Sequence, residues 1–213
     1  MKHNKIGYYD YTVVLTYSGM LLACAGIFLI MRNEYWQSLI CLMAAGVCDM
    51  FDGTVAKTKK RGEDEKRFGI QIDSLSDLVS FGVFPALFVY QISDSSPVIG
   101  FIAAAYILAA LIRLAYFNVL EERRQQETPE QCGGFLGVPV TTIAVLLPVL
   151  YAAYDHQLFR STYLFSFLLF LTGIGFLTPV RIKKPNILGK IVLIAVGVIE
   201  AVLVLMFAGW DAV

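Results

Sequence analysis

The feature that most constrains this chain is a series of long, uncharged apolar runs separated by short polar segments. An α-helix rises about 1.5 Å per residue, so a run of roughly 20 apolar residues crosses the hydrocarbon core of a bilayer. The composition agrees, since 57% of the residues are hydrophobic and 16% are charged, against about 45–50% and 25% in soluble domains. We therefore expect an all-α fold, a polytopic transmembrane helical bundle.

Seven runs are long enough to be considered as spans. They cover residues 12–31, 35–57, 68–90, 97–120, 138–154, 163–179 and 187–207. The fifth and sixth are near the lower length limit for a membrane helix, so the prediction is six to seven spans or more. The chain contains no internal repeat and no linker between two folding units. Residues 1–213 are expected to form a single integral membrane domain.

The distribution of basic residues predicts the orientation. With the amino terminus in the cytoplasm, fourteen of the 17 Lys and Arg residues lie in cytoplasmic segments. Positive charge concentrates on the cytoplasmic side of membrane proteins. We expect a multi-pass protein of the cell membrane with its amino terminus inside. The formal net charge of zero gives no indication of a nucleic-acid partner.

Four aspartates interrupt the second and third runs, where membrane helices normally avoid charge. They are Asp49 and Asp52 in the second run and Asp73 and Asp77 in the third. A carboxylate in hydrocarbon costs several kcal/mol unless it is paired or hydrated, and four close together repel one another. A bound cation is the natural compensation. Carboxylate oxygens suit Mg²⁺, Mn²⁺ or Ca²⁺ better than zinc.

Helix geometry brings these acids onto two faces that can meet. The second run places Asp49 and Asp52 within an arc of roughly 100°, and the third places Asp73 and Asp77 within an arc of roughly 80°. The intervening segment, residues 58–67, is short and polar, so the two helices are expected to be antiparallel neighbours joined by a solvated loop. Small residues on the same faces would leave room for a ligand; they are Gly53, Ala56 and Gly69. The site should open toward the cytoplasm.

These residues resemble the signature of the CDP-alcohol phosphotransferases. That pattern has two aspartates, a glycine and an Ala-Arg pair, followed by a glycine and two further aspartates at spacings of four. The matching positions here are Asp49, Asp52, Gly53, Ala56, Lys57, Gly69, Asp73 and Asp77. The family arginine is replaced by Lys57, which keeps the charge but loses the planar fork of a guanidinium.

The residues beyond the signature are similar to those of the phosphatidylserine synthases within that family. The similar segments are residues 74–86 and the stretch Arg113-Leu-Ala-Tyr-Phe-Asn118. The resemblance implies transfer of the phosphatidyl group of CDP-diacylglycerol to the hydroxyl of L-serine, with release of CMP. It also implies a homodimer in membrane lipid and a site facing the cytoplasm.

The resemblance implies a role for each matching residue. Asp49, Asp52 and Asp73 would be the core ligands of Mg²⁺ or Mn²⁺. Asp77 would also belong to the metal site and would act as general base. The donor would be contacted by Gly53, Ala56, Lys57 and Gly69. Arg113 lies within a span and needs an anionic partner, which could be an aspartate, a substrate phosphate or the serine carboxylate; a structural ion pair is equally open.

Two alternatives remain from the sequence. The acceptor could be glycerol phosphate, inositol phosphate or another alcohol, with the same metal site. A different class, the ion-coupled transporters, also carries intramembrane aspartates. A transporter would be expected to show inverted repeats, which this chain lacks, and its acids would not lie close to the cytoplasmic surface.

Overall fold

The computed structural model describes residues 7–126, 135–179 and 181–182. Its helices are α1 (Tyr11–Met31), α2 (Tyr35–Ala56), α3 (Glu63–Asp77), α4 (Phe84–Ile92), α5 (Pro97–Gln126), α6 (Ile143–Asp155) and α7 (Tyr163–Leu177). The six predicted spans that fall in this part of the chain each correspond to helical structure. The seventh, residues 187–207, lies outside the described residues, as do Lys2 and Lys5 of the amino-terminal segment.

Four of the helical segments are long and apolar enough to cross a membrane. They are α1, α2, the continuous helix Glu63–Ile92 that joins α3 to α4, and the part of α5 from Pro97 to Glu122. Two shorter apolar helical segments follow, Val140–Asp155 and Tyr163–Leu177. The predicted all-α membrane bundle is therefore confirmed. The short pair is the fifth and sixth predicted spans, which the sequence already placed near the lower length limit.

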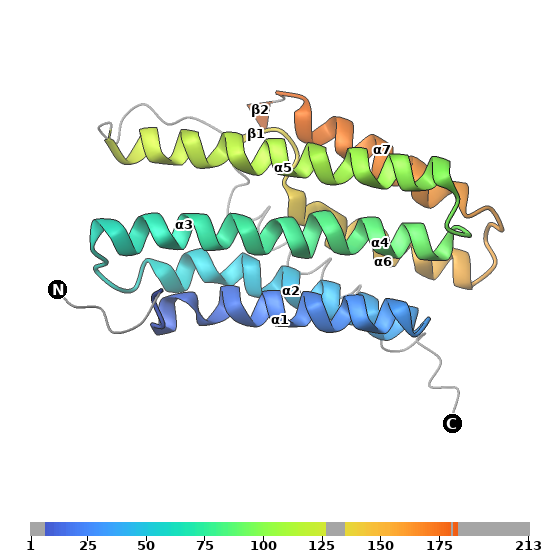
Figure 1. Ribbon diagram of the computed structural model, residues 1–213, viewed down its shortest axis with the longest axis horizontal. Helices are drawn as coiled ribbons and strands as arrows, with labels where there is room; N and C mark the ends of the chain where they lie inside the picture. Colours follow the sequence, from blue (N-terminus) through green and yellow to red (C-terminus); the bar gives the residue numbers. More distant parts are fainter. Residues whose placement is uncertain (1–6, 127–134, 180, 183–213) are drawn as a thin grey trace.

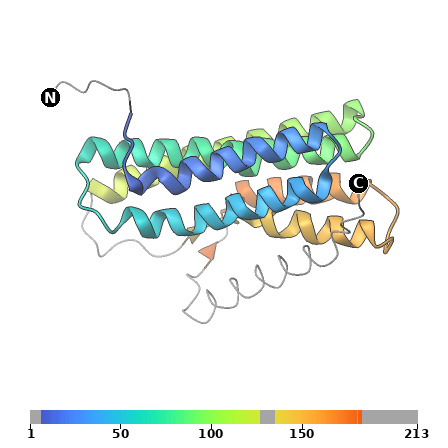
Figure 2. The ribbon, with the colours of Figure 1, turned by 90° about the horizontal axis from the view of Figure 1, so that it is seen from below.

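The helices lie side by side along the long axis of the molecule (Figures 1 and 2). Helix α1 packs against α2 and against the α3–α4 helix, while α5 packs against α4 and α7, and α2 packs against α6. Fully buried aromatic and aliphatic side chains fill the space between them; the largest include Phe81, Phe84, Phe88, Tyr106 and Phe165. Helix α1 packs against both α2 and α3, so α1 and the short loop together hold the two helices that carry the aspartates.

Two helices extend further than the hydrophobic pattern indicates. Helix α3 begins at Glu63 rather than near residue 68, because its first turn carries Glu63, Asp64 and Glu65. Negative charge is favourable at a helix amino terminus. Helix α5 continues to Gln126, six residues past the predicted end.

A two-residue antiparallel pairing of β1 (Phe135–Leu136) with β2 (Arg181–Ile182) is a small addition to the all-α prediction.

A π-helical segment, Leu78–Val83, joins α3 to α4 directly after Asp77. Wider turns of this kind alter the backbone hydrogen bonding and recur at functional sites. Here the hydroxyl of Tyr106 on α5 donates a hydrogen bond of 2.7 Å to the carbonyl oxygen of Phe81. Both side chains are buried. The hydroxyl therefore gives a carbonyl within the π-helix a partner from outside its own helix, and ties α5 to the segment that follows the aspartates.

Candidate metal and phosphate site

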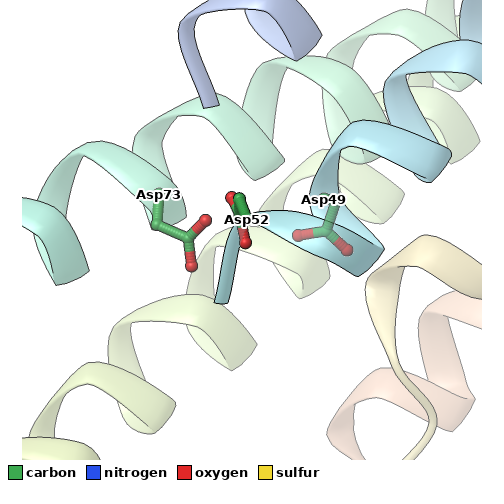
Figure 3. A group of neighbouring side chains, drawn as sticks. All are labelled: Asp49, Asp52 and Asp73. Carbon is green, nitrogen blue, oxygen red and sulfur yellow. The ribbon is translucent and has the colours of Figure 1, made fainter. Parts of the chain in front are cut away.

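Three of the four predicted aspartates form a compact cluster between α2 and α3. One carboxylate oxygen from each of Asp49, Asp52 and Asp73 lies within 4.8 Å of the other two. Figure 3 shows the carboxylates facing a common space, with Asp49 and Asp52 carried by α2 and Asp73 by α3. The spacing of three residues between the first two acids puts both on the face of α2 that meets α3.

This oxygen set fits a hard divalent cation. Mg²⁺ binds oxygens at about 2.0–2.1 Å, so opposite ligands on one ion are roughly 4.2 Å apart. A separation of up to 4.8 Å needs only a small inward movement of the side chains. Because three like charges meet in a largely apolar bundle, a cation would also relieve their repulsion. The chemistry favours Mg²⁺, Mn²⁺ or Ca²⁺ and does not distinguish among them.

Asp52 is also supported from α1, which the sequence analysis did not foresee. The hydroxyl of Thr16 donates a hydrogen bond of 3.0 Å to Oδ2 of Asp52. Ser76 on α3 donates in turn to the backbone carbonyl oxygen of Thr16, at 3.3 Å. All three residues are buried. In the sequence, Thr16 is only a hydroxyl residue on the face of the first span that carries small residues. An uncharged side chain in that position does not by itself indicate a contact with an aspartate.

Asp77 occupies a separate position beside the cluster. Its carboxyl group neighbours that of Asp49, but it is not one of the three residues whose oxygens converge. It lines a small cavity together with Thr16, Asp52 and Ser80. The cavity offers about 10 Å³ of water-sized space, room for about one water molecule. Asp77 therefore adjoins the cluster, beside Asp49, without being one of the three acids whose oxygens converge.

The small residues of the signature differ in what surrounds them. A β-carbon on Gly53 would meet no atom within 4 Å among the described residues, so the space beside α2 is open there. At Gly69 the corresponding space holds the guanidinium of Arg61, whose Nη1 lies 2.8 Å from the β-carbon position. Ala56 is half-buried, and Lys57, which ends α2, is exposed.

The loop between α2 and α3 is anchored by a second lysine. Lys59 forms ion pairs with Asp10, at the start of α1, and with Glu65 on α3. The hydrogen bond from Lys59 holds the pKa of Asp10 below its ordinary value. The loop is therefore fixed over the adjoining ends of α1, α2 and α3.

Arg113 lies on α5 and is buried, with 7% of its surface exposed. Its guanidinium carbon is 4.5 Å from the centre of the Phe117 ring, a distance typical of a cation–π contact. Its Nη1 is 2.7 Å from the β-carbon position of Gly137, whose φ of +78° favours glycine. Any side chain at residue 137 would displace the guanidinium, so Arg113 is tightly enclosed.

A polar contact that the sequence analysis missed links α3 to α5 beside the cluster. The hydroxyl of Ser74, the residue after Asp73, donates a hydrogen bond of 2.6 Å to Oδ1 of Asn118. The amide of Asn118 donates to Oε1 of Gln71, at 3.4 Å. Arg113 and Asn118 both belong to the stretch that resembles the phosphatidylserine synthases. Of these two residues, Asn118 contacts α3, the helix that carries Asp73 and Asp77.

Comparison with known proteins agrees with this arrangement. Three curated relatives are each a CDP-diacylglycerol–serine O-phosphatidyltransferase. The protein from Saccharomyces cerevisiae is 30% identical over 83% of this chain and 70% of its own length. That from Methanocaldococcus jannaschii is 32% identical over 80% of this chain and 74% of its own. The protein from Helicobacter pylori strain 26695 is 30% identical over 84% of this chain and 73% of its own length.

A family comparison covers most of the helical bundle. The sequence model of the CDP-alcohol phosphatidyltransferase family matches residues 12–178, a range that contains the whole aspartate cluster and the described helices from α1 to α7 except the first residue of α1. This match favours a transferase over the ion-coupled transporter that the sequence left open. The chain belongs to the CDP-alcohol phosphatidyltransferase family.

Proposed function

We propose that this protein transfers the phosphatidyl group of CDP-diacylglycerol to the hydroxyl of L-serine, giving phosphatidylserine and CMP. The observation that carries the proposal is the convergence of Asp49, Asp52 and Asp73 within 4.8 Å of one another, in a member of this family. The choice of serine rests on the names of the three relatives. We further propose a homodimer in the cell membrane with its amino terminus and active site toward the cytoplasm.

The three converging aspartates are the proposed ligands of Mg²⁺ or Mn²⁺. Bound there, the cation would neutralise charge on the diphosphate of the donor and on the leaving CMP. The residues themselves orient the site, because α2 supplies two ligands and α3 supplies the third. Open space beside Gly53 would admit the nucleotide close to the backbone of α2, with Ala56, Lys57 and Gly69 along the same path.

Asp77 is the proposed general base. It lies beside the cluster without being among the three converging carboxylates, so it can accept a proton while the others bind metal. The Asp77 carboxylate takes the proton of the serine hydroxyl. The serine oxygen then forms a bond to the phosphorus that carries diacylglycerol, and the bond from that phosphorus to CMP breaks, leaving the electron pair on CMP. Arg113 is the proposed contact for an anionic group of a substrate.

The proposal is tested by CMP release from CDP-diacylglycerol by the purified protein with Mg²⁺ or Mn²⁺. The acceptors are L-serine, glycerol 3-phosphate, inositol phosphate and no acceptor. We expect release with serine alone. Asp77→Asn should fold and bind donor but lower turnover by roughly 100-fold or more, the usual contribution of a general base. Release with another acceptor would contradict the serine assignment, and substantial turnover by Asp77→Asn would contradict the base role.

A further inference from the structure

The sequence predicts a solvated loop between α2 and α3, but the side chain of Arg61 in that loop is not fully exposed. Its neighbours Lys57, Lys59 and Lys60 are exposed, whereas Arg61 is half-buried. Its side chain folds back onto α3, with Nη1 at 2.8 Å and the guanidinium carbon at 3.8 Å from the β-carbon position of Gly69. The guanidinium therefore fills the space that the absence of a side chain at Gly69 creates.

That space lies on the helix face that carries the metal cluster. Gly69 precedes Asp73 by four residues, which corresponds to about one helical turn and roughly 6 Å along α3. A diphosphate bound through a cation at Asp49, Asp52 and Asp73 would thus be within about one turn of the Arg61 guanidinium. A flexible side chain in this position can reach such a group without movement of the helices.

Arg61 forms no close ion pair that would occupy its guanidinium. Within the described part of the chain, the ion pairs of this loop, with Asp10 and Glu65, are made by Lys59, and Arg61 acts on Asp10 only as a more distant charge. The ion pairs of Lys59 fix the loop on both sides, because Asp10 begins α1 and Glu65 lies on α3. The loop is thus held in place while the guanidinium next to Gly69 keeps its hydrogen-bond donors for another partner.

We propose that Arg61 binds the diphosphate of the nucleotide donor, and so takes the place of the arginine that the family signature has where this chain has Lys57. A guanidinium presents two parallel donors to phosphate oxygens, which a lysine ammonium cannot do. Lys57 is exposed at the end of α2, and Arg61 supplies the fork from the following loop. The inference rests on the proposed function only in that the donor is a CDP-linked lipid; it does not depend on the acceptor.

The test is the affinity of the detergent-purified, full-length protein for CDP in the presence of Mn²⁺, measured by calorimetry. Arg61→Ala should weaken CDP binding by roughly 10-fold to 100-fold, the effect of losing charge-assisted hydrogen bonds. Arg61→Lys should recover only part of the loss, because it restores the charge without the fork. Lys60→Ala is the matched control: it removes one positive charge from the same loop at an exposed position, and its affinity should equal that of the wild type.

Kinetics provide a second readout that separates donor binding from general damage. Arg61→Ala should raise the KM for CDP-diacylglycerol while leaving the KM for the acceptor near its wild-type value. Wild-type affinity for CDP in Arg61→Ala, or an equal loss in Lys60→Ala, would overturn the proposal. Absence of CDP binding by the wild-type protein would overturn the proposed function as well, whereas turnover with an acceptor other than serine would leave the role of Arg61 supported by the CDP measurement.

Discussion

At the scale of single residues, Asp52 has the most closely defined surroundings of the three converging aspartates. Its Oδ2 accepts the hydroxyl of Thr16, and Ser76 donates to the carbonyl oxygen of Thr16. A hydrogen bond to one oxygen restricts rotation of the carboxylate and so orients the other oxygen. Partners of this kind commonly hold metal-ligating carboxylates in place. Helix α1 thus contributes to the proposed metal site without supplying one of its three carboxylates.

Replacement of Thr16 should weaken metal binding. Thr16→Val keeps the branched shape and removes the hydroxyl, and loss of a group that orients a metal ligand typically costs 10-fold to 100-fold in affinity. The measurement is a titration with Mn²⁺ followed by electron paramagnetic resonance. Thr12→Val is the control, one turn earlier on the same helix, because the buried hydroxyl of Thr12 has no hydrogen-bond partner among the described residues. Equal Mn²⁺ affinity in both variants would contradict the role of Thr16.

Residues with a local signal were predictable, and residues whose role depends on distant contacts were not. The acids of α2 and α3 stand out because charge in an apolar run is costly, and their spacing places them on facing surfaces. Thr16 carries no charge, and nothing near it in sequence indicates that it meets Asp52, 36 residues away. Arg61 looks like any loop cation until the packing against Gly69 is known. The sequence also predicts that Asp77 belongs to the metal site; this remains a prediction, because the three carboxylates that converge are those of Asp49, Asp52 and Asp73.

At the scale of elements, small residues along α1 allow close packing against its neighbours. Gly19, Ala23 and Gly26 are buried and share a face with Thr16. A β-carbon on Gly26 would clash with Cε1 of the Phe84 ring and would lie 3.1 Å from Cβ of Cys41. Glycine at this position therefore lets α1 approach both α2 and α4. The same approach brings Thr16 within hydrogen-bond distance of Asp52.

Gly26→Ala should destabilise the bundle. Phe84 is fully buried, so its ring cannot move aside, and overpacking of this kind costs about 1–3 kcal/mol of folding free energy. The measurement is the thermal unfolding temperature in one detergent. Gly173→Ala on α7 is the control, because its β-carbon would meet neighbours at 3.7–3.8 Å, an ordinary packing distance. A Gly26→Ala protein as stable as the Gly173→Ala protein would contradict the close approach of α1 to α4.

The helices themselves were largely predictable, while one feature of their geometry was not. Long apolar runs defined α1 and α2 to within one residue at each end. The π-helix Leu78–Val83 was not foreseen, because it depends on contacts between helices, including the hydrogen bond from Tyr106 to Phe81. Since this segment begins directly after Asp77, its wider turn sets how Asp77 is placed relative to the buried residues Ser80 and Phe81 that share its cavity.

At the scale of the whole molecule, the proposed metal site depends on three helices held together by a loop and a buried interface. Helices α2 and α3 carry the acids, α1 orients one of them, and Lys59 joins the loop to both α1 and α3. Because α1, α2 and the continuous helix Glu63–Ile92 are long and apolar enough to cross a membrane, the lipid chains of the proposed substrate can remain in the bilayer while its polar head group enters between the helices. We propose that this assembly links a divalent cation to transfer of a phosphatidyl group to serine.

The most direct measurement of that claim follows isotope-labelled L-serine into lipid, using the purified protein reconstituted in vesicles that contain CDP-diacylglycerol. Lipid products are identified by mass spectrometry before chelation, after chelation with EDTA, and after Mg²⁺ or Mn²⁺ is restored. We expect labelled phosphatidylserine to form, to stop forming on chelation, and to form again when the metal is returned. Labelled product that continues to form without divalent metal, or no labelled product from folded protein with metal present, would contradict the account.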